Sequence, residues 1–346
     1  MTHDVAIVGD RFMRSARFAE ALEAACGTGV ACRGIDLPWP DEPMVAGDAA
    51  SGTEGLLECQ GDPDAIVAHA ADAPILVTHL APLSAGMLAR LPALELVAVS
   101  RGGPVNIDTG AARARGVKVV NTPGRNASAV AEFTIGAIIA ETRNIARGHE
   151  ALSRGEWRED LYRADVQRDE LSRLTVGVVG YGEIGTRVVR LLRAFGCRIL
   201  VDDPYRELSN EDHAAGVRRV DLDALLAAAD VVTLHARVSE ETRGFMNAEV
   251  FARMRPGSVF VNTARGPMVD YAALHEALAS GHLGGAMLET FDVEPLPSDS
   301  PIARLPNVTL TPHIAGASLT TVRVAAERVA EEVRRHLAGE PPLNPC

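Results

Sequence analysis

The 346-residue sequence contains few cysteines, and they are scattered rather than paired. Cys26, Cys32, Cys59, Cys197 and Cys346 form no C-x-x-C motif and no Cys/His spacing typical of a metal site. An odd number of dispersed cysteines favours reduced thiols over a disulfide framework. We therefore predict a cytoplasmic protein without a metal site.

The sequence also lacks long apolar segments and an excess of basic residues. No segment approaches the ~18 apolar residues of a membrane-spanning helix, and the N-terminus has no basic stretch followed by an apolar one. Lys and Arg number 34 against 46 Asp and Glu, which gives a formal charge of −12. Because nucleic-acid binding depends on basic side chains, we expect no nucleic-acid partner. Because no long apolar segment is present, we expect no membrane partner either.

The strongest local signal lies in the middle of the chain. An apolar run at 175–179, predicted to be a strand, is followed by the motif G-x-G-x-x-G, formed by Gly180, Gly182 and Gly185, and then by an apolar repeat with helical spacing. In a dinucleotide-binding unit such glycines allow a tight turn, close approach of a pyrophosphate and close helix packing. The order of the elements therefore indicates a dinucleotide site rather than ordinary turns.

A carboxylate follows at the position expected for ribose binding. A second predicted strand, 198–201, leads to Asp203, at about the 20-residue spacing from Gly180 that such a carboxylate takes. A carboxylate here accepts the ribose hydroxyls of NAD and repels the 2′-phosphate of NADP. Arg206 lies three residues further on and weakens this preference. The sequence predicts NAD as the cofactor, with NADP less favoured.

Predicted strands and helices alternate along the chain, which is typical of an α/β fold with parallel sheets. Because the glycine motif lies in mid-chain, we assign both chain ends to the other domain. We predict two Rossmann- or flavodoxin-like doubly wound domains with a cleft between them: a discontinuous substrate domain, 1–123 and 317–346, and a cofactor domain, 124–316. A single long helix, from Ser128 as N-cap to Arg147, is predicted between the first sheet and the second.

Reactive side chains occur in the segments that follow three predicted strands of the cofactor domain. The three side chains are Arg265, Glu294 and His313. Ligands of open parallel sheets bind beyond the carboxyl ends of the strands, so the three could converge. Each also has a structural alternative: an ion-pair partner, an exposed turn residue and a hydrogen-bonded loop histidine. The competing titratable residues are His79, His235, Glu289 and Asp292.

The three residue types suit the reduction of a 2-oxo acid. An arginine holds a carboxylate in a planar, bidentate grip and stays charged. A histidine titrates near neutral pH and can act as acid or base. A carboxylate bonded to the imidazole orients it and favours its protonated form.

The sequence resembles the D-isomer-specific 2-hydroxyacid dehydrogenases, the family of phosphoglycerate, glyoxylate/hydroxypyruvate and D-lactate dehydrogenases. The matching segments are SRGGPVNID (100–108), VVNTPGRNASAVAEFT (119–134), VGVVGYGEIG (176–185), DDPY (202–205), VNTARGPMVD (261–270), FDVEP (291–295) and LTPHIAG (310–316). The resemblance implies an NAD-dependent oxidoreductase with Arg265, Glu294 and His313 as catalytic residues. It also implies a homodimer through residues 140–170, which include Trp157 and Tyr162.

The resemblance assigns ligand-binding residues as well. The implied cofactor-binding residues are Gly180, Gly182, Glu183, Ile184, Gly185, Asp203, Pro204, His235, Ala236, Thr263, Ala264, Glu289 and Gly316. The implied substrate-binding residues are Thr78, His79, Leu80, Ser100, Arg101, Gly102 and Gly103. In addition, Arg101, His79 and Arg125 suggest a second anionic or polyhydroxylated group on the substrate, as in 3-phosphoglycerate or a sugar acid.

The sequence departs from the family pattern at three places and leaves other functions open. Glu289 stands where the family usually has Asp, Arg237 falls in the usual His-x-Pro-Leu segment, and Ser100–Pro104 replaces the more common R-A-G-x-G. We expect no regulatory domain after Cys346. A non-enzymatic, NAD-sensing protein like the C-terminal binding protein corepressors is the alternative. A formate dehydrogenase relative is disfavoured, because that group lacks the equivalent of Glu294.

Overall fold

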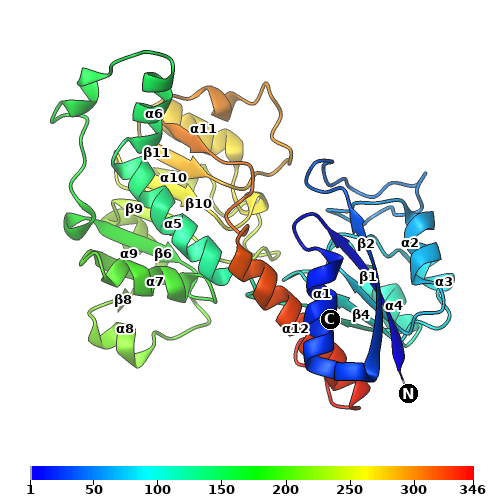
Figure 1. Ribbon diagram of the computed structural model, residues 1–346. Coiled ribbons are helices and arrows are strands. Elements are labelled where there is room, and N and C mark those ends of the chain that lie inside the picture. Colours follow the sequence, from blue (N-terminus) through cyan, green and yellow to red (C-terminus); the bar gives the residue numbers. More distant parts are fainter. Residues whose placement is uncertain (1) are drawn as a thin grey trace. The chain divides into compact units, whose positions relative to one another are not determined.

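Two parallel sheets, of five and seven strands, form the framework of the protein (Figure 1). The structure is a computed structural model and describes residues 2–346. The chain up to Arg125 together with Ser318–Cys346 forms unit 1, and Asn126–Ala317 forms unit 2. The predicted fold class, two doubly wound α/β domains, is confirmed. The predicted limits at 123/124 and 316/317 lie within two residues of the limits of these units.

The sheet of unit 1 has the strand order β2-β1-β3-β4-β5. Its strands are β1 (His3–Asp10), β2 (Val30–Leu37), β3 (Ile75–Thr78), β4 (Leu96–Val99) and β5 (Lys118–Val120). The chain passes from β1 to β2 on one side and then returns to β3 on the other, so the winding reverses between β1 and β3. In open parallel sheets the ligand crevice lies at such a reversal, outside the carboxyl ends of the strands.

Helices cover both faces of the unit 1 sheet. They are α1 (Ser15–Cys26), α2 (Pro63–Ala70), α3 (Ala85–Ala89), α4 (Thr109–Ala114) and α12 (Leu319–Leu337). α1 and α12 pack side by side on one face (Figure 1), where Val5 shares a core with Phe18 and Val329. Val8 belongs to the core on the other face, with Ile66 of α2. Residues near the C-terminus complete the unit, because the backbone of Cys346 donates to the carbonyl of Val119 at the β5 edge.

Unit 2 has the strand order β12-β11-β10-β9-β6-β7-β8. Its strands are β6 (Thr175–Val179), β7 (Arg198–Asp202), β8 (Arg218–Arg219), β9 (Val231–Leu234), β10 (Val259–Asn262), β11 (Gly285–Leu288) and β12 (Val308–Leu310). Its helices are α5 (Ala127–Thr142), α6 (Ile145–Ser153), α7 (Gly185–Arg193), α8 (Asn210–Ala214), α9 (Leu222–Ala228), α10 (Ala248–Arg253) and α11 (Tyr271–Ala279). The winding reverses between β6 and β9, which places the ligand crevice beside the glycine motif.

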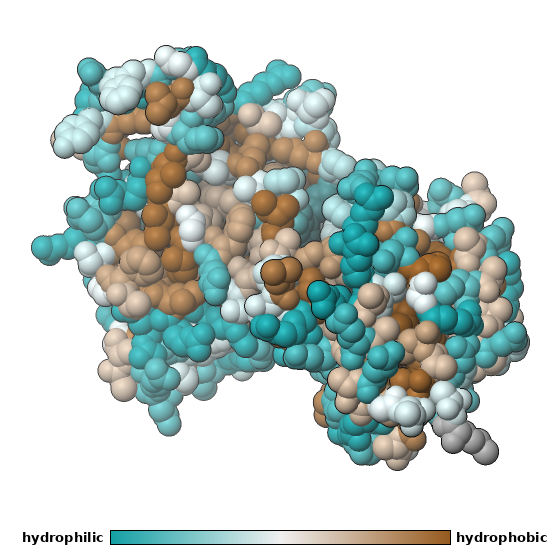
Figure 2. Space-filling view, viewed as in Figure 1, coloured by the Kyte–Doolittle hydropathy of each residue, from teal (hydrophilic) through white to brown (hydrophobic). Residues whose placement is uncertain are grey.

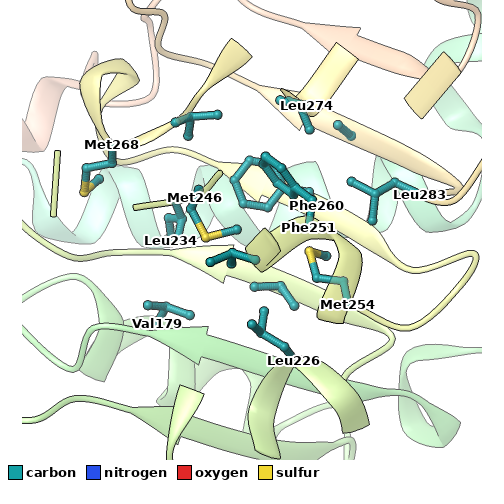
Figure 3. Close-up of a cluster of buried hydrophobic side chains, with 14 of the residues drawn as sticks. Val179, Leu226, Leu234, Met246, Phe251, Met254, Phe260, Met268, Leu274 and Leu283 are labelled. Atoms are coloured by element: carbon teal, nitrogen blue, oxygen red, sulfur yellow. The ribbon is translucent and has the colours of Figure 1, made fainter. Parts of the chain in front are cut away.

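A cluster of buried side chains joins one face of the unit 2 sheet to α9, α10 and α11 (Figure 3). Phe251 of α10 and Phe260 of β10 meet edge to face, with ring centroids 5.3 Å apart and planes at 85°. Met246, Met254 and Met268 belong to the same cluster, where flexible thioether side chains fill irregular gaps. A second cluster of buried side chains packs α5 and α7 against the opposite face. The unit 2 sheet is therefore covered by helices on both faces.

The predicted helix from Ser128 to Arg147 is wrong at both ends. α5 begins after Asn126, and Ser128 is not its cap. It ends at Thr142, and Asn144 takes a left-handed conformation with φ +56° before α6 begins at Ile145. Asn tolerates this conformation well. Its side-chain oxygen also accepts a bond from Arg147 (2.9 Å), which turns that side chain back over the break.

Several helices begin at capping side chains that the sequence displays. The carboxylate of Asp270, the residue before α11, accepts bonds from the backbone of Ala272 and Ala273 (3.0 Å each). The short helices α3, α4, α8 and α10 and the two-residue strand β8 were not predicted, because segments of two to six residues show no clear periodicity. Within residues 2–346, the structure has no helix with the length and apolarity required to cross a membrane.

Candidate active site

The glycine motif occupies the turn between β6 and α7. Gly180 has φ +98°, and a Cβ added there would lie 2.7 Å from the backbone nitrogen of Ala236. A Cβ on Gly185 would lie 2.0 Å from the carbonyl oxygen of Gly180. Neither position therefore accepts a side chain. A Cβ on Gly182 would meet no atom within 4 Å, so this side of the turn has room for a ligand.

The N-terminus of α7 adds an electrostatic element to this turn. No side chain of the described residues caps it, since its N-cap residue is Ile184. The first N–H groups of a helix have no intrahelical acceptor, and together with the helix dipole they attract anions. The glycine turn and this helix end therefore fit the pyrophosphate of a dinucleotide.

Asp203 lies beside the turn, at the end of β7. Its Oδ2 accepts a bond from the backbone of Tyr181 (2.7 Å), and its Oδ1 accepts bonds from the backbone of Tyr205 (2.8 Å) and Arg206 (3.0 Å). Three backbone donors fix the carboxylate against the glycine turn. Each carboxylate oxygen accepts more than one bond, so this arrangement also fits a ribose hydroxyl.

His235 directly follows β9, the strand next to β6. It is only 8% exposed, and its Nε2 lies 3.0 Å from the hydroxyl of Thr233. Burial lowers its pKa to about 3, so the ring is neutral at physiological pH. Its Nδ1 is buried without a partner among the described residues. A neutral imidazole is a weak acid, so burial makes His235 less suited than an exposed histidine to donate a proton in catalysis.

Glu294 and His313 form a hydrogen-bonded pair. Oε2 of Glu294 lies 2.7 Å from Nδ1 of His313, and about a third of each side chain is exposed. Burial alone would raise the pKa of Glu294, but the hydrogen bond and charge of His313, the backbone of Phe291 and the charge of Arg265 lower it. Oε1 of Glu294 accepts the bond from Phe291 (2.8 Å). With Nδ1 engaged, Nε2 of the imidazole forms no hydrogen bond with another described residue and is available to a substrate.

Glu289 supports the backbone that carries His313. His313 takes a left-handed conformation with φ +53°, which is uncommon for a non-glycine residue. Its N–H donates to the carbonyl of Glu289 (3.0 Å), and the carboxylate of Glu289 accepts from the backbone of Ala315 (2.7 Å). Burial raises the pKa of Glu289. Glu289 is therefore held in the loop beside the pair rather than being an exposed competing carboxylate.

Arg265 follows β10 and shares its edge of the sheet with the pair. The strands β10, β11 and β12, which precede Arg265, Glu294 and His313, are neighbours in the sheet. The side chain of Asn262 holds the turn, since it donates to the carbonyl of Arg265 (3.2 Å) and accepts from the backbone of Ala264 (3.0 Å). Arg265 donates to the carbonyl of Ala264 (2.7 Å) and, within residues 2–346, to neither member of the pair. Its exposed guanidinium can thus bind a carboxylate from solution.

The remaining predicted cofactor-binding residues also follow strands of unit 2. Glu183 and Ile184 lie in the glycine turn and Pro204 after β7, while Ala236, Thr263 and Gly316 follow β9, β10 and β12. The hydroxyl of Thr263 bonds to that of Thr134 in α5 (2.8 Å). No cluster of His, Cys, Asp or Glu that could hold a metal ion occurs in residues 2–346.

The predicted substrate-binding residues lie in unit 1, after β3 and β4. Thr78, His79, Leu80 and Ser100 are buried, and the hydroxyl of Ser100 has no partner in the described chain. Arg101 forms an ion pair with Glu58. His79 bonds to Asp10 of β1 (2.6 Å) and to Arg125 (3.1 Å). The role of Asp10 was missed, because it lies 69 residues from His79 and no local pattern signals the pairing.

Residues 135–315 match the family model of the NAD binding domain of D-isomer specific 2-hydroxyacid dehydrogenase. The chain belongs to this family. It is 35% identical over 310 residues to the glyoxylate reductase of Korarchaeum cryptofilum, covering 90% of this chain and 88% of that one. It is 37% identical over 280 residues to the D-3-phosphoglycerate dehydrogenase of Mycobacterium tuberculosis, covering 81% of this chain but 52% of that relative.

Solved structures of the D-2-hydroxyacid dehydrogenase family show the same fold. The D-isomer specific 2-hydroxyacid dehydrogenase of Xanthobacter autotrophicus Py2, in complex with NADPH and MES, matches with a TM-score of 0.71 and 29% identity over 100% of this chain and 98% of that one. The prediction of an oxidoreductase with an NAD-binding domain is confirmed. Arg265, Glu294 and His313 all lie within the matched residues.

Proposed function

We propose that the protein interconverts a D-2-hydroxy acid and its 2-oxo acid, and that Arg265, Glu294 and His313 carry the chemistry. The main support is the 2.7 Å bond between Glu294 and His313, at the same edge of the sheet as Arg265. Such a pair provides an oriented imidazole, and the arginine provides a fixed positive charge. Together these meet the needs of carbonyl reduction beside a carboxylate.

In the direction of reduction, Arg265 binds the substrate carboxylate and polarises the neighbouring carbonyl group. When bound, NADH supplies the hydride for the carbonyl carbon. His313 donates a proton from Nε2 to the carbonyl oxygen as negative charge develops there. Glu294 keeps the protonated ring oriented through Nδ1 and stabilises its charge. In oxidation the imidazole takes the proton back.

The test is His313→Ala in the full-length protein. We expect kcat to fall by about 10²–10⁴-fold, because proton transfer is lost, while the Kd for NADH stays unchanged. His213→Ala, which alters an exposed histidine of the same unit, is the matched control and should behave as wild type. Turnover by His313→Ala within a few fold of wild type would contradict the assigned role.

We propose that the substrate binds to residues 78–80 and 100–103 of unit 1. Their position at the carboxyl ends of β3 and β4, and the unpaired buried hydroxyl of Ser100, support this assignment. The proposed substrates are phosphorylated or polyhydroxylated 2-hydroxy acids such as 3-phosphoglycerate. Steady-state assays across 2-oxo acids with NADH and with NADPH identify the substrate. Asp203 favours NADH in this comparison.

The same assays address the corepressor-like alternative. A non-enzymatic NAD-sensing protein binds NADH but turns over no 2-oxo acid. The proposed dehydrogenase combines saturable NADH binding with turnover that depends on His313.

We also propose a cytoplasmic location, since all five cysteines are free thiols in the structure.

We propose a homodimer formed through the segment that contains α6. Apolar side chains that are more than half exposed gather there: Ile145, Leu152, Trp157 and Tyr162. Figure 2 shows hydrophobic atoms among hydrophilic ones where this segment lies, at the upper left of the view. Aromatic residues of this kind are enriched in protein interfaces.

A further inference from the structure

Three titratable residues meet where the winding of the unit 1 sheet reverses. Asp10 is the last residue of β1, and His79 directly follows β3, the adjacent strand. Arg125, the last residue of unit 1 before unit 2 begins, reaches the same point. The reversal between β1 and β3 is where open parallel sheets bind their ligands.

The hydrogen bonds of the cluster run in one direction. An arginine only donates, so Nη2 of Arg125 donates to Nε2 of His79 (3.1 Å), and the proton of the neutral ring lies on Nδ1. Nδ1 then donates to Oδ2 of Asp10 (2.6 Å). Oδ1 of Asp10 accepts bonds from the backbone of Phe12 (2.9 Å) and Met13 (2.7 Å).

The imidazole is also fixed by its packing. The ring centroids of Phe12 and Trp39 lie 6.0 Å and 5.6 Å from that of His79. Burial lowers the pKa of His79, and the charge of Arg125 lowers it further, against the opposing effect of Asp10. The ring therefore stays neutral and serves as an acceptor for Arg125.

Arg125 is charged and contacts no carboxylate directly, although the charge of Asp10 acts on it across the imidazole of His79 and raises its pKa. Burial lowers its pKa to about 10, so it remains protonated at neutral pH. No carboxylate of residues 2–346 forms an ion pair with it, whereas Arg101 is paired with Glu58. Nη1 of Arg125 is buried without an acceptor. A charged nitrogen that is buried without an acceptor is costly, which points to an anionic partner.

We propose that Arg125 binds a second anionic group of the substrate, a phosphate or a carboxylate remote from the 2-oxo group. This inference rests on the proposed function and defines its substrate class as 2-oxo and 2-hydroxy acids that carry a second anionic group. His79 and Asp10 are positioning residues. The imidazole between Asp10 and Arg125 orients the guanidinium without neutralising it, whereas a direct carboxylate contact would compete with the ligand.

The test compares matched pairs of 2-oxo acids that differ by one anionic group. 3-Phosphohydroxypyruvate is compared with hydroxypyruvate, and oxaloacetate with pyruvate, so that the two pairs distinguish phosphate from carboxylate. In one of the two pairs, wild type has a higher kcat/KM for the acid with the second anionic group than for the matched acid without it. Arg125→Gln lowers this ratio by about 100-fold, mainly through KM, because a buried charged bond is lost. Arg125→Lys, which keeps the charge, loses less.

The control is Arg90→Gln, which removes an exposed arginine of unit 1 that is already paired with Asp64. It should leave the ratio unchanged. A second readout needs no turnover: with saturating NADH, inorganic phosphate raises the Tm of wild type and Arg90→Gln but not that of Arg125→Gln.

The two readouts separate this inference from the proposed function. If no 2-oxo acid is reduced but the phosphate effect depends on Arg125, the anion site stands and the proposed function fails. If 2-oxo acids are reduced while neither the ratio nor the phosphate effect depends on Arg125, the anion site is overturned and the proposed function stands.

Discussion

At the scale of single residues, burial separates the histidines of unit 2. His235 is enclosed beside the glycine turn, and its ring is neutral at physiological pH. His313 is exposed and shares a hydrogen bond with Glu294. One strand end thus offers a neutral ring suited to contact with an uncharged part of a ligand, and another offers a ring oriented for proton transfer.

The burial of His235 predicts a pH dependence of stability. Its pKa is about 3 in the folded protein and 6.5 in the reference state, so the unfolded chain binds more protons between these values. Stability is therefore lost as pH falls below 6.5. The free energy of unfolding should be about 2 kcal/mol lower at pH 5 than at pH 7.5 from this group alone. Urea titrations of wild type and His235→Asn at both pH values measure it.

In these titrations His235→Asn should show a drop that is smaller by this amount. His213→Asn, which replaces an exposed histidine, should keep the wild-type drop. An equal drop in wild type and His235→Asn would mean that His235 is protonated in the folded protein.

At the scale of elements, the turn between β6 and α7 contains one glycine that the fold itself requires, Gly185, and one that we expect only cofactor binding to require, Gly182. Gly185→Ala should lower Tm as well as NADH affinity, because its Cβ would lie 2.0 Å from a backbone oxygen. Gly182→Ala should fold with wild-type Tm, since its Cβ meets no atom within 4 Å, but bind NADH at least about 10-fold more weakly. Thermal unfolding and fluorescence titration with NADH distinguish the two. Wild-type NADH affinity in Gly182→Ala would contradict the placement of the pyrophosphate.

The long elements follow the sequence pattern closely, and short or interrupted ones do not. From Leu319 to Leu337 apolar residues recur with helical spacing, and the structure has one unbroken helix there, α12. The break between α5 and α6 was not predicted, because apolar spacing continues across it and the reversal depends on one left-handed residue, Asn144. Local periodicity carries no information on such a turn.

The same distinction holds for the site: features that local sequence patterns indicate were predicted, and those that depend on strand order were not. Arg265, Glu294 and His313 were predicted because each lies a few residues after a strand and because the family resemblance implies them, and the sheet places those strands side by side. The bond between Asp10 and His79 requires β1 and β3 to be neighbours, which depends on strand order. The sequence indicates the strands but not their order.

At the scale of the whole molecule, the exposed residues near α6 predict the oligomeric state. Wild type should elute as a dimer at micromolar concentration, and a double variant Leu152→Asp, Trp157→Asp as a monomer, since charges placed in an apolar interface oppose association. Leu319→Asp changes the 89% exposed leucine of unit 1 and is the control that should stay dimeric. Size-exclusion chromatography with light scattering measures this. A monomeric wild type would remove the proposed interface.

Unit 1 is assembled from both ends of the chain, and this sets an order on its folding during translation. The apolar face that carries Val5 and Phe18 is completed by Val329 of α12. The ribosome must synthesise all of Asn126–Ala317 before α12 emerges. At typical rates of synthesis this takes about 10 to 40 s. Unit 2 can thus reach its fold while the nascent unit 1 still exposes α1 and its sheet, which makes the first unit to be synthesised the last to be protected from aggregation.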